Sequence, residues 1–324
     1  MTCEKQIDTL LLLALPASGK SEVRRYLASL TPEQCRREFH IGQTVQLDDF
    51  PYVHLMRRID QELVALGQEP LFFASQERPF SDPVEWGTLI ELLNEDYGDL
   101  LERRVPTPES AARHLFDRLE AARRRVGGPP KLHGLPGDVL ERLARAMEEE
   151  AAEQLRSKIS EQPDSVEGRT IVLEFARGGP QGSSMPLPAP FGYAYALSVL
   201  SDEILGRSAV LYVWVTPEES RRKNEARADP DDPGSILHHG VPIEVMLNDY
   251  GCDDMEHLIA RSDRADTVRV ETRGKVYHLP VARFDNRVDK TTFVRDDPSA
   301  WKPEQVEALH EGLKQAFSRL ARNL

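Results

Sequence analysis

The sequence predicts an α/β protein with three layers, in which helices cover both faces of a mostly parallel, five-stranded sheet. Three observations lead to this prediction. Helical patterns separate consecutive apolar or β-prone runs, which is the order expected of parallel strands joined by crossover helices. The stretch between the second and third runs is long and helical, which indicates an insertion. The runs lie near residues 7–14, 43–48, 170–176, 209–215 and 276–284.

The composition excludes several classes of protein. The chain has 324 residues and a formal net charge of −13, so we expect neither general nucleic-acid binding nor attraction to an anionic membrane. Cys3, Cys35 and Cys252 are scattered, which argues against a disulfide framework or a zinc site and favours a reducing, cytoplasmic location. No apolar run approaches the roughly 20 residues that span a bilayer. The sequence leaves open whether the protein is a homo-oligomer.

The first predicted strand, residues 7–14, leads through a short turn into an amphipathic helix over residues 20–30. A secretion signal would also contain an apolar run, but it would begin with a basic segment. Here Glu4 and Asp8 precede the run against the single Lys5, so we interpret it as a buried strand.

The turn after this strand matches the pattern GxxxxGK[ST] over residues 14–21, with Ala14 in place of the first glycine. In such a turn, successive backbone N–H groups curl around a phosphate, and the following helix adds the positive end of its dipole. Gly19 allows close approach, Lys20 would bridge the outer phosphates, and the Ser21 hydroxyl would hold Mg²⁺. The Cβ of Ala14 would crowd the turn. The predicted nucleotide-binding residues are Pro16, Ala17, Ser18, Gly19, Lys20 and Ser21.

This stretch resembles the P-loop containing nucleoside triphosphate hydrolase superfamily, and within it the nucleoside, nucleotide and small-metabolite kinases. The resemblance is specific over residues 14–21, looser at the later strands and absent over much of residues 52–165. It implies a P-loop fold, with ATP or another nucleoside triphosphate and Mg²⁺ as cofactors. It also implies a small-molecule acceptor, and it makes Lys20 a catalytic residue.

The second predicted strand ends in Asp48 and Asp49, directly before Phe50 and Pro51. Ligands collect at the carboxyl ends of strands in α/β sheets, and a carboxylate there can accept the proton of an attacking hydroxyl. The segment looks like the Asp-Asp-Phe stretch of uridine-kinase-like enzymes, which implies a catalytic base. We place Asp48 first in that role and Asp49 second. The alternative for Asp49 is to cap the helix that begins near Pro51.

The third predicted strand runs through apolar residues to Glu174, with Arg177 just beyond it. An apolar strand that ends in an acid is the Walker B pattern, in which the carboxylate holds Mg²⁺ directly or through water. The guanidinium of Arg177 could grip a phosphate or carboxylate in a bidentate manner. The alternative is a salt bridge at the end of the strand.

The fourth predicted strand leads into a helix that carries several arginines, including Arg222 and Arg227. In the resembling kinases the corresponding segment is a lid whose arginines neutralise the charge of the transferring phosphoryl group, and this resemblance makes both residues candidate catalytic residues. The alternative is an ordinary solvated helix face, as in most runs of charge.

The residues divide into a nucleotide-binding core, 1–50 and 166–324, and a helical insertion, 51–165. The resembling kinases bind the acceptor with helices at the position of the insertion, but a dimerisation surface or a regulatory cap would have the same pattern. Arg57 and Arg58 near its start could reach an anionic acceptor, or could belong to an exposed helix face.

These observations predict an ATP- and Mg²⁺-dependent kinase that acts on a hydroxyl or phosphate of a small molecule. Two alternatives stay open. One is a nucleotide-hydrolysing switch whose insertion binds a protein partner, and the other is a nucleotide-binding module without chemistry. Turnover that needs no acceptor would favour the switch.

Overall fold

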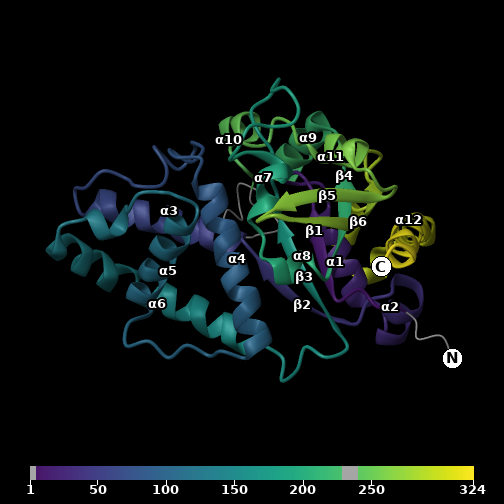
Figure 1. Ribbon diagram of the computed structural model, residues 1–324, viewed down its shortest axis with the longest axis horizontal. Coiled ribbons are helices and arrows are strands. Elements are labelled where there is room, and N and C mark those ends of the chain that lie inside the picture. Colours follow the sequence, from purple (N-terminus) through teal and green to yellow (C-terminus); the bar gives the residue numbers. More distant parts are fainter. Residues whose placement is uncertain (1–4, 228–239) are drawn as a thin grey trace.

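The computed structural model describes residues 5–227 and 240–324. Within them the strands form one six-stranded sheet, in the order β2-β3-β1-β4-β6-β5 (Figure 1). All neighbouring pairs are parallel except the antiparallel pair of β5 and β6. The prediction of an α/β fold with a mostly parallel sheet is therefore confirmed. The strands are β1 (Thr9–Leu13), β2 (Gln43–Asp48), β3 (Arg169–Phe175), β4 (Ser208–Trp214), β5 (Thr267–Thr272) and β6 (Lys275–Asp285).

The prediction of five strands was wrong because it overlooked β5 at the edge of the sheet. β5 and β6 form a hairpin whose two turn residues, Arg273 and Gly274, both have positive φ, at 49° and 72°. Such a turn matches the twist of paired antiparallel strands. The alternation of Val268 and Val270 with polar residues, followed by a glycine turn, is the signal that could have revealed this strand.

Helices cover both faces of the sheet. α1 (Lys20–Ser29), α2 (Pro32–Phe39) and α12 (Pro303–Arg322) pack on one face, where Val23, Phe39 and Phe317 belong to one apolar cluster. The opposite face is covered by α4 (Glu85–Glu102), α7 (Gly192–Val199), α8 (Asp202–Leu205) and α11 (Met255–Arg261). Every residue of β1 is buried, as expected for a parallel strand covered on both faces.

The chain leaves the adjacent strands β1 and β3 in opposite directions. β1 continues into α1 on one face, whereas β3 continues towards α7 on the other face. The loops after these two strands diverge, which opens a crevice at the carboxyl ends of the strands. Ligands bind at such switch points in open α/β sheets.

The segment between β2 and β3 is helical, and it lies beside the sheet at the left of Figure 1. It has an apolar cluster of its own, which includes Met56, Phe116 and Met147. α4 is apolar on two sides: Leu89 and Leu92 face this cluster, and other residues face the sheet. The helical elements of the segment are α3 (Phe50–Ala65), α4, α5 (Ala111–Arg125), η1 (Leu132–Gly134) and α6 (Gly137–Ser160).

The remaining elements lie after β4 and around the last strand. The predicted helix after β4 is α9, which begins directly after Thr216, and the hydroxyl of Thr216 accepts a hydrogen bond from the Glu219 backbone N–H. The elements are α9 (Pro217–Arg227), α10 (Ile243–Asn248), η2 (Thr292–Arg295) and η3 (Pro298–Ala300).

Candidate active site

A cavity of about 550 Å³ lies at the carboxyl ends of β1, β2 and β3. Its size suits a small-molecule site. Residues 16–21 line one side, which we call the loop side. Asp48, Asp49 and Glu174 line the same cavity, so the structure brings together the loop and the three predicted carboxylates. The other side, which we call the aromatic side, is formed by Arg57, Phe73, Phe80, Trp86, Asp249 and Tyr250.

The loop side has the backbone shape of an anion-binding turn. Ala17 and Gly19 both adopt positive φ, at 54° and 104°, and α1 begins at the next residue, Lys20. Gly19 is the N-cap residue of α1, and no side chain caps this end of the helix. The first N–H groups of α1 and its positive dipole end therefore remain available to an anion.

The loop is held in this shape by the segment after β6. The Asn286 side chain is fully buried and donates hydrogen bonds to the Ser18 carbonyl and the Thr291 hydroxyl, each at 2.8 Å. A Cβ atom at Gly19 would lie 2.8 Å from the Asn286 amide nitrogen and still closer to the Thr291 hydroxyl. From another direction, the Ser220 hydroxyl donates to the Pro16 carbonyl at 2.7 Å. Glycine at position 19 is thus required both by φ and by packing.

Lys20 and Ala14 meet at the base of the loop. The Lys20 ammonium donates to the carbonyls of Ala14 and Leu15 at 3.3 and 3.4 Å. Ala14 is fully buried among the apolar residues beneath the loop, and its φ is not positive. The expectation that its Cβ would crowd the turn was wrong, because the methyl group packs into the core instead.

The capping alternative assigned the helix cap to Asp49, but in the structure Asp48 makes the side-chain contact at the start of the helix. Asp48 accepts a hydrogen bond from the Phe50 N–H at 2.7 Å, at the start of α3. Asp49 occupies the N-cap position of α3 but makes no capping hydrogen bond. Its carboxylate instead pairs with the Arg177 guanidinium at 2.6 Å, so the prediction of a cap at Asp49 was wrong.

Burial raises the pKa of both Asp48 and Asp49, and the charge of Arg177 opposes the increase at Asp49. Burial, together with the negative charges of Glu174 and Asp49, raises the pKa of Asp48 to about 7, while the hydrogen bond from Phe50 and the charge of Arg24 oppose the increase. A carboxylate with a pKa near 7 can accept a proton at neutral pH and release it readily.

Glu174 makes an ion pair that the sequence did not identify. The Arg24 guanidinium lies 2.6 Å from the Glu174 carboxylate and 3.9 Å from that of Asp48. Arg24 follows Lys20 by four residues on α1, so both side chains lie on the same face of the helix, and this spacing is the signal that was missed. The alternative of a salt bridge at the end of β3 therefore describes the contact seen at Glu174.

Oxygen ligands suited to Mg²⁺ line the cavity. Ser21 and Glu174 both border the cavity and both carry oxygen donors. Among the described residues, no group of three or more His, Cys, Asp or Glu side chains forms a ready-made metal cage. The donor set fits a magnesium ion that takes only one or two protein ligands and is completed by phosphates and water.

Of the predicted catalytic arginines, neither Arg177 nor Arg222 lines the cavity. Arg177 is almost fully buried and, besides Asp49, contacts the backbone carbonyls of Ala176 and Trp86. It therefore holds the Asp49 carboxylate in position and does not itself line the cavity. Arg222 is exposed on α9, where it pairs with Glu219 at 2.6 Å. The side chain of Arg227 lies outside the described part of the structure.

The aromatic side is a chain of ring contacts that the sequence analysis did not detect. Phe73 stacks on Phe80 with centroids 4.5 Å apart, and Trp86 lies edge-on to Phe80 at 5.0 Å and to Tyr250 at 5.6 Å. The guanidinium of Arg57 lies 3.8 Å from the Phe73 ring centroid. The loop before α4 therefore supplies two of the four rings, Phe73 and Phe80, and α4 supplies Trp86.

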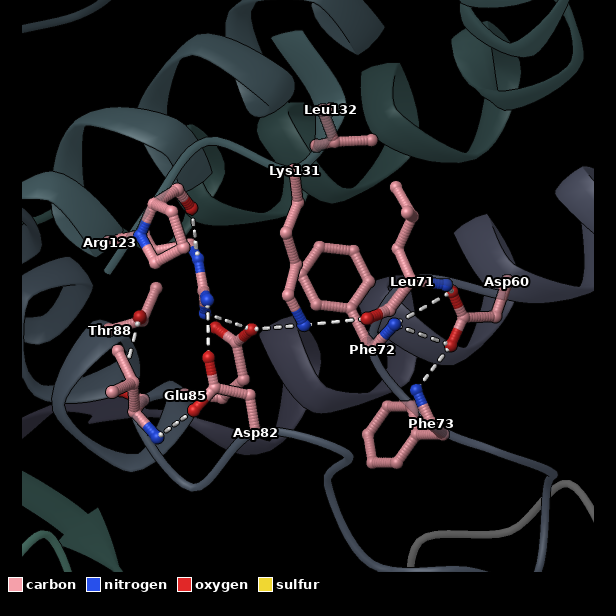
Figure 2. A network of polar contacts seen from close by, with 12 residues as sticks. Asp60, Leu71, Phe72, Phe73, Asp82, Glu85, Thr88, Arg123, Lys131 and Leu132 are labelled. Atoms are coloured by element: carbon pink, nitrogen blue, oxygen red, sulfur yellow. Dashed lines mark hydrogen bonds and ion pairs between the residues drawn. The ribbon is translucent and has the colours of Figure 1, made fainter. Parts of the chain in front are cut away.

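A buried polar network holds this loop in place (Figure 2). The Asp60 carboxylate accepts hydrogen bonds from the N–H groups of three consecutive residues, Leu71, Phe72 and Phe73. The fully buried Glu85 carboxylate contacts the Arg123 guanidinium and lies 3.0 Å from the Lys131 ammonium. The network therefore ties the loop before α4 to α3 and α5, and removal of one partner from such a buried ion pair costs about 3–5 kcal/mol.

No protein-family model matches the chain, and no curated protein shows significant similarity to it. Among the helices of residues 5–227 and 240–324, none combines the length and the apolar character needed to cross a membrane.

Proposed function

We propose that the protein is a Mg²⁺-dependent phosphotransferase that transfers a phosphoryl group from ATP, or another nucleoside triphosphate, to a hydroxyl or phosphate of a small molecule. On this proposal the core is a P-loop fold. One observation carries the proposal: a single cavity joins an anion-binding turn, the Lys20 ammonium and a carboxylate whose pKa is close to 7.

Each group of the cavity has a role in this reaction. The backbone N–H groups of residues 17–21 and the Lys20 ammonium bind the phosphates, and Ser21 and Glu174 would hold Mg²⁺. The ion would neutralise charge on the phosphates. Arg24, between Asp48 and Glu174, adds a positive charge where the phosphoryl group passes. Such positioning and charge stabilisation account for most of the catalysis of phosphoryl transfer.

Asp48 acts as the general base when the acceptor is an alcohol. The hydroxyl oxygen forms a bond to the γ-phosphorus while the bond from that phosphorus to the β–γ bridging oxygen breaks. The nucleoside diphosphate leaves, and the hydroxyl proton goes to Asp48. Arg177 holds the neighbouring Asp49 at 2.6 Å, so Asp48 is the carboxylate that remains available for the proton.

The proposal is tested by measuring the release of ADP from ATP·Mg²⁺ in the presence of a panel of alcohols and monophosphates. Nucleotide binding is measured separately by calorimetry. We expect release that depends on an acceptor, and loss of both binding and release in Lys20→Met. Release of ADP at the same rate without any acceptor would contradict the proposal and favour a nucleotide-hydrolysing switch. Absence of nucleotide binding in the unchanged protein would also contradict it.

A further inference from the structure

Two buried polar groups on the aromatic side of the cavity have no hydrogen-bond partner within the described residues. The first is the indole N–H of Trp86. The second is the carboxylate of Asp249, a residue that lines the cavity and is only 5% exposed; no hydrogen bond or ion pair joins this carboxylate to another described residue. Buried polar groups are nearly always paired in proteins, and an unpaired buried charge is especially costly. Both groups line the same cavity, so a ligand is the natural partner for each.

The cations near Asp249 are engaged elsewhere. The Arg57 guanidinium donates to the backbone carbonyls of Gln76 and Arg78 at 2.7 and 3.3 Å, and it covers the Phe73 ring. It forms no ion pair with Asp249, although its charge partly offsets burial, which raises the pKa of Asp249 to about 7. Arg177, whose guanidinium lies 4.9 Å from the centroid of the Trp86 ring, is paired with Asp49. A positive charge on the ligand would complete the site.

We infer that the aromatic side binds the non-reacting end of the acceptor, and that this end carries an ammonium group on an apolar or aromatic body. Asp249 would pair with the ammonium group, the aromatic rings would surround the body, and the Trp86 N–H would donate to an oxygen of the ligand. This inference rests on the proposed function, and it narrows the acceptor to an amine-bearing alcohol.

The surroundings favour an ammonium group over a neutral donor. A neutral N–H or O–H would satisfy one carboxylate oxygen but would leave its charge uncompensated in a largely apolar cavity. An ammonium group gains both a charge-assisted hydrogen bond and attraction to the aromatic rings of Phe80, Trp86 and Tyr250. Because ionised Asp249 is the binding form, affinity for an amine should be higher at pH 8 than at pH 6.

The test uses two probes of nearly equal size, 2-phenylethylamine and 2-phenylethanol, titrated into the full chain and followed by ligand-observed NMR. We expect the amine to bind roughly tenfold more tightly than the alcohol, as a charged hydrogen bond implies. In Asp249→Asn, which keeps the shape of the side chain, the ratio should fall to near one. The exposed Asp117→Asn is the matched control and should retain the ratio of the unchanged protein. Circular dichroism establishes that each variant is folded.

Trp86→Phe is the second variant, since it keeps an aromatic ring and removes only the N–H group. It should weaken a probe that carries both an amine and an ether oxygen, 2-phenoxyethylamine, more than it weakens 2-phenylethylamine. Equal binding of amine and alcohol to the unchanged protein would overturn the inference, as would a ratio that survives Asp249→Asn.

Failure of the inference and failure of the proposed function are distinguishable, because nucleotide binding is measured separately. ATP·Mg²⁺ binding that Lys20→Met abolishes, without any preference for amines, overturns only the amine subsite. A preference for amines that Asp249→Asn abolishes, in a protein that binds no nucleotide, overturns the phosphotransferase and leaves the amine subsite standing.

Discussion

The two sides of the cavity are built in different ways. The loop side consists of six consecutive residues, 16–21, and it uses backbone N–H groups at the start of a helix. The aromatic side combines side chains from α3, the loop before α4, α4 itself and the chain after α10. Backbone groups at a turn are the same for any sequence that can adopt the turn, whereas a side-chain wall depends on which residues pack there. On the proposed function, the loop side binds the phosphates that all nucleotides share, and the aromatic side binds one particular acceptor.

Asp48 lines the same cavity as both sides, and its substitution should have the largest effect. Removal of a general base reduces turnover by about 10²–10⁴-fold, so we expect a loss in this range for Asp48→Asn. In the unchanged protein, kcat/KM should rise as the pH increases through about 7, because only ionised Asp48 accepts a proton. Steady-state rates from pH 5.5 to 9 measure both effects. A pH profile that is identical in Asp48→Asn would remove Asp48 from the mechanism.

The same substitution should stabilise the protein at high pH. The pKa of Asp48 is higher in the folded protein, at about 7, than the ordinary value of about 4 in an unfolded chain. The folded state therefore binds more protons between these values, and Asp48 costs stability as the pH rises through them. Asp48→Asn should unfold at a higher temperature than the unchanged protein at pH 8 but not at pH 4, as measured by thermal denaturation.

The protein should lose stability when the polar network that supports the aromatic side is broken. Glu85→Ala removes the buried partner of Arg123 and Lys131 and should cost about 3–5 kcal/mol of stability. Urea denaturation measures the change. Glu102→Ala, at the exposed end of the same helix, is the control and should change stability by less than about 0.5 kcal/mol. Comparable losses in the two variants would show that the network does not hold the loop.

The loop side should be disrupted by Gly19→Ala. The left-handed φ and the crowding against Thr291 together should cost about 3 kcal/mol and should weaken nucleotide binding strongly. Gly127→Ala is a matched control, because Gly127 also has positive φ but has open space around its Cβ position. It should cost only about 1 kcal/mol. Equal losses of stability in the two variants would mean that Asn286 and Thr291 move to make room for the Cβ atom at position 19.

The smallest effect is expected when the brace behind the loop is removed. Asn286→Ala deletes the hydrogen bonds to Ser18 and Thr291 and should cost about 1–2 kcal/mol, with a modest loss of nucleotide affinity. The exposed Asn323→Ala is the control for stability. Unchanged nucleotide affinity in Asn286→Ala would show that the loop keeps its shape without the brace.

Much of the fold and the loop side follow from the sequence by itself. β1, β2, β3, β4 and β6 were expected from local apolar patterns, and the GKS turn at residues 19–21 from a motif of short range. These features depend on neighbouring residues, because strands, helices and phosphate-binding turns form from local backbone geometry. The packing of Ala14 beneath the loop could not be predicted from local sequence patterns. Residues distant in the chain decide whether there is space for its Cβ atom.

Only the tertiary structure decided which charged groups meet and what forms the rest of the cavity. Asp49 and Arg177 are 128 residues apart, and Arg24 and Glu174 are 150 apart, yet each pair is in contact. Nothing local distinguishes a paired arginine from one that could bind a ligand, because its partner comes from another part of the chain. The sequence therefore determined most of the sheet and the turn over residues 16–21. The packing of the helical segment against the sheet determined the aromatic side and left the Asp249 carboxylate without a partner among the described residues.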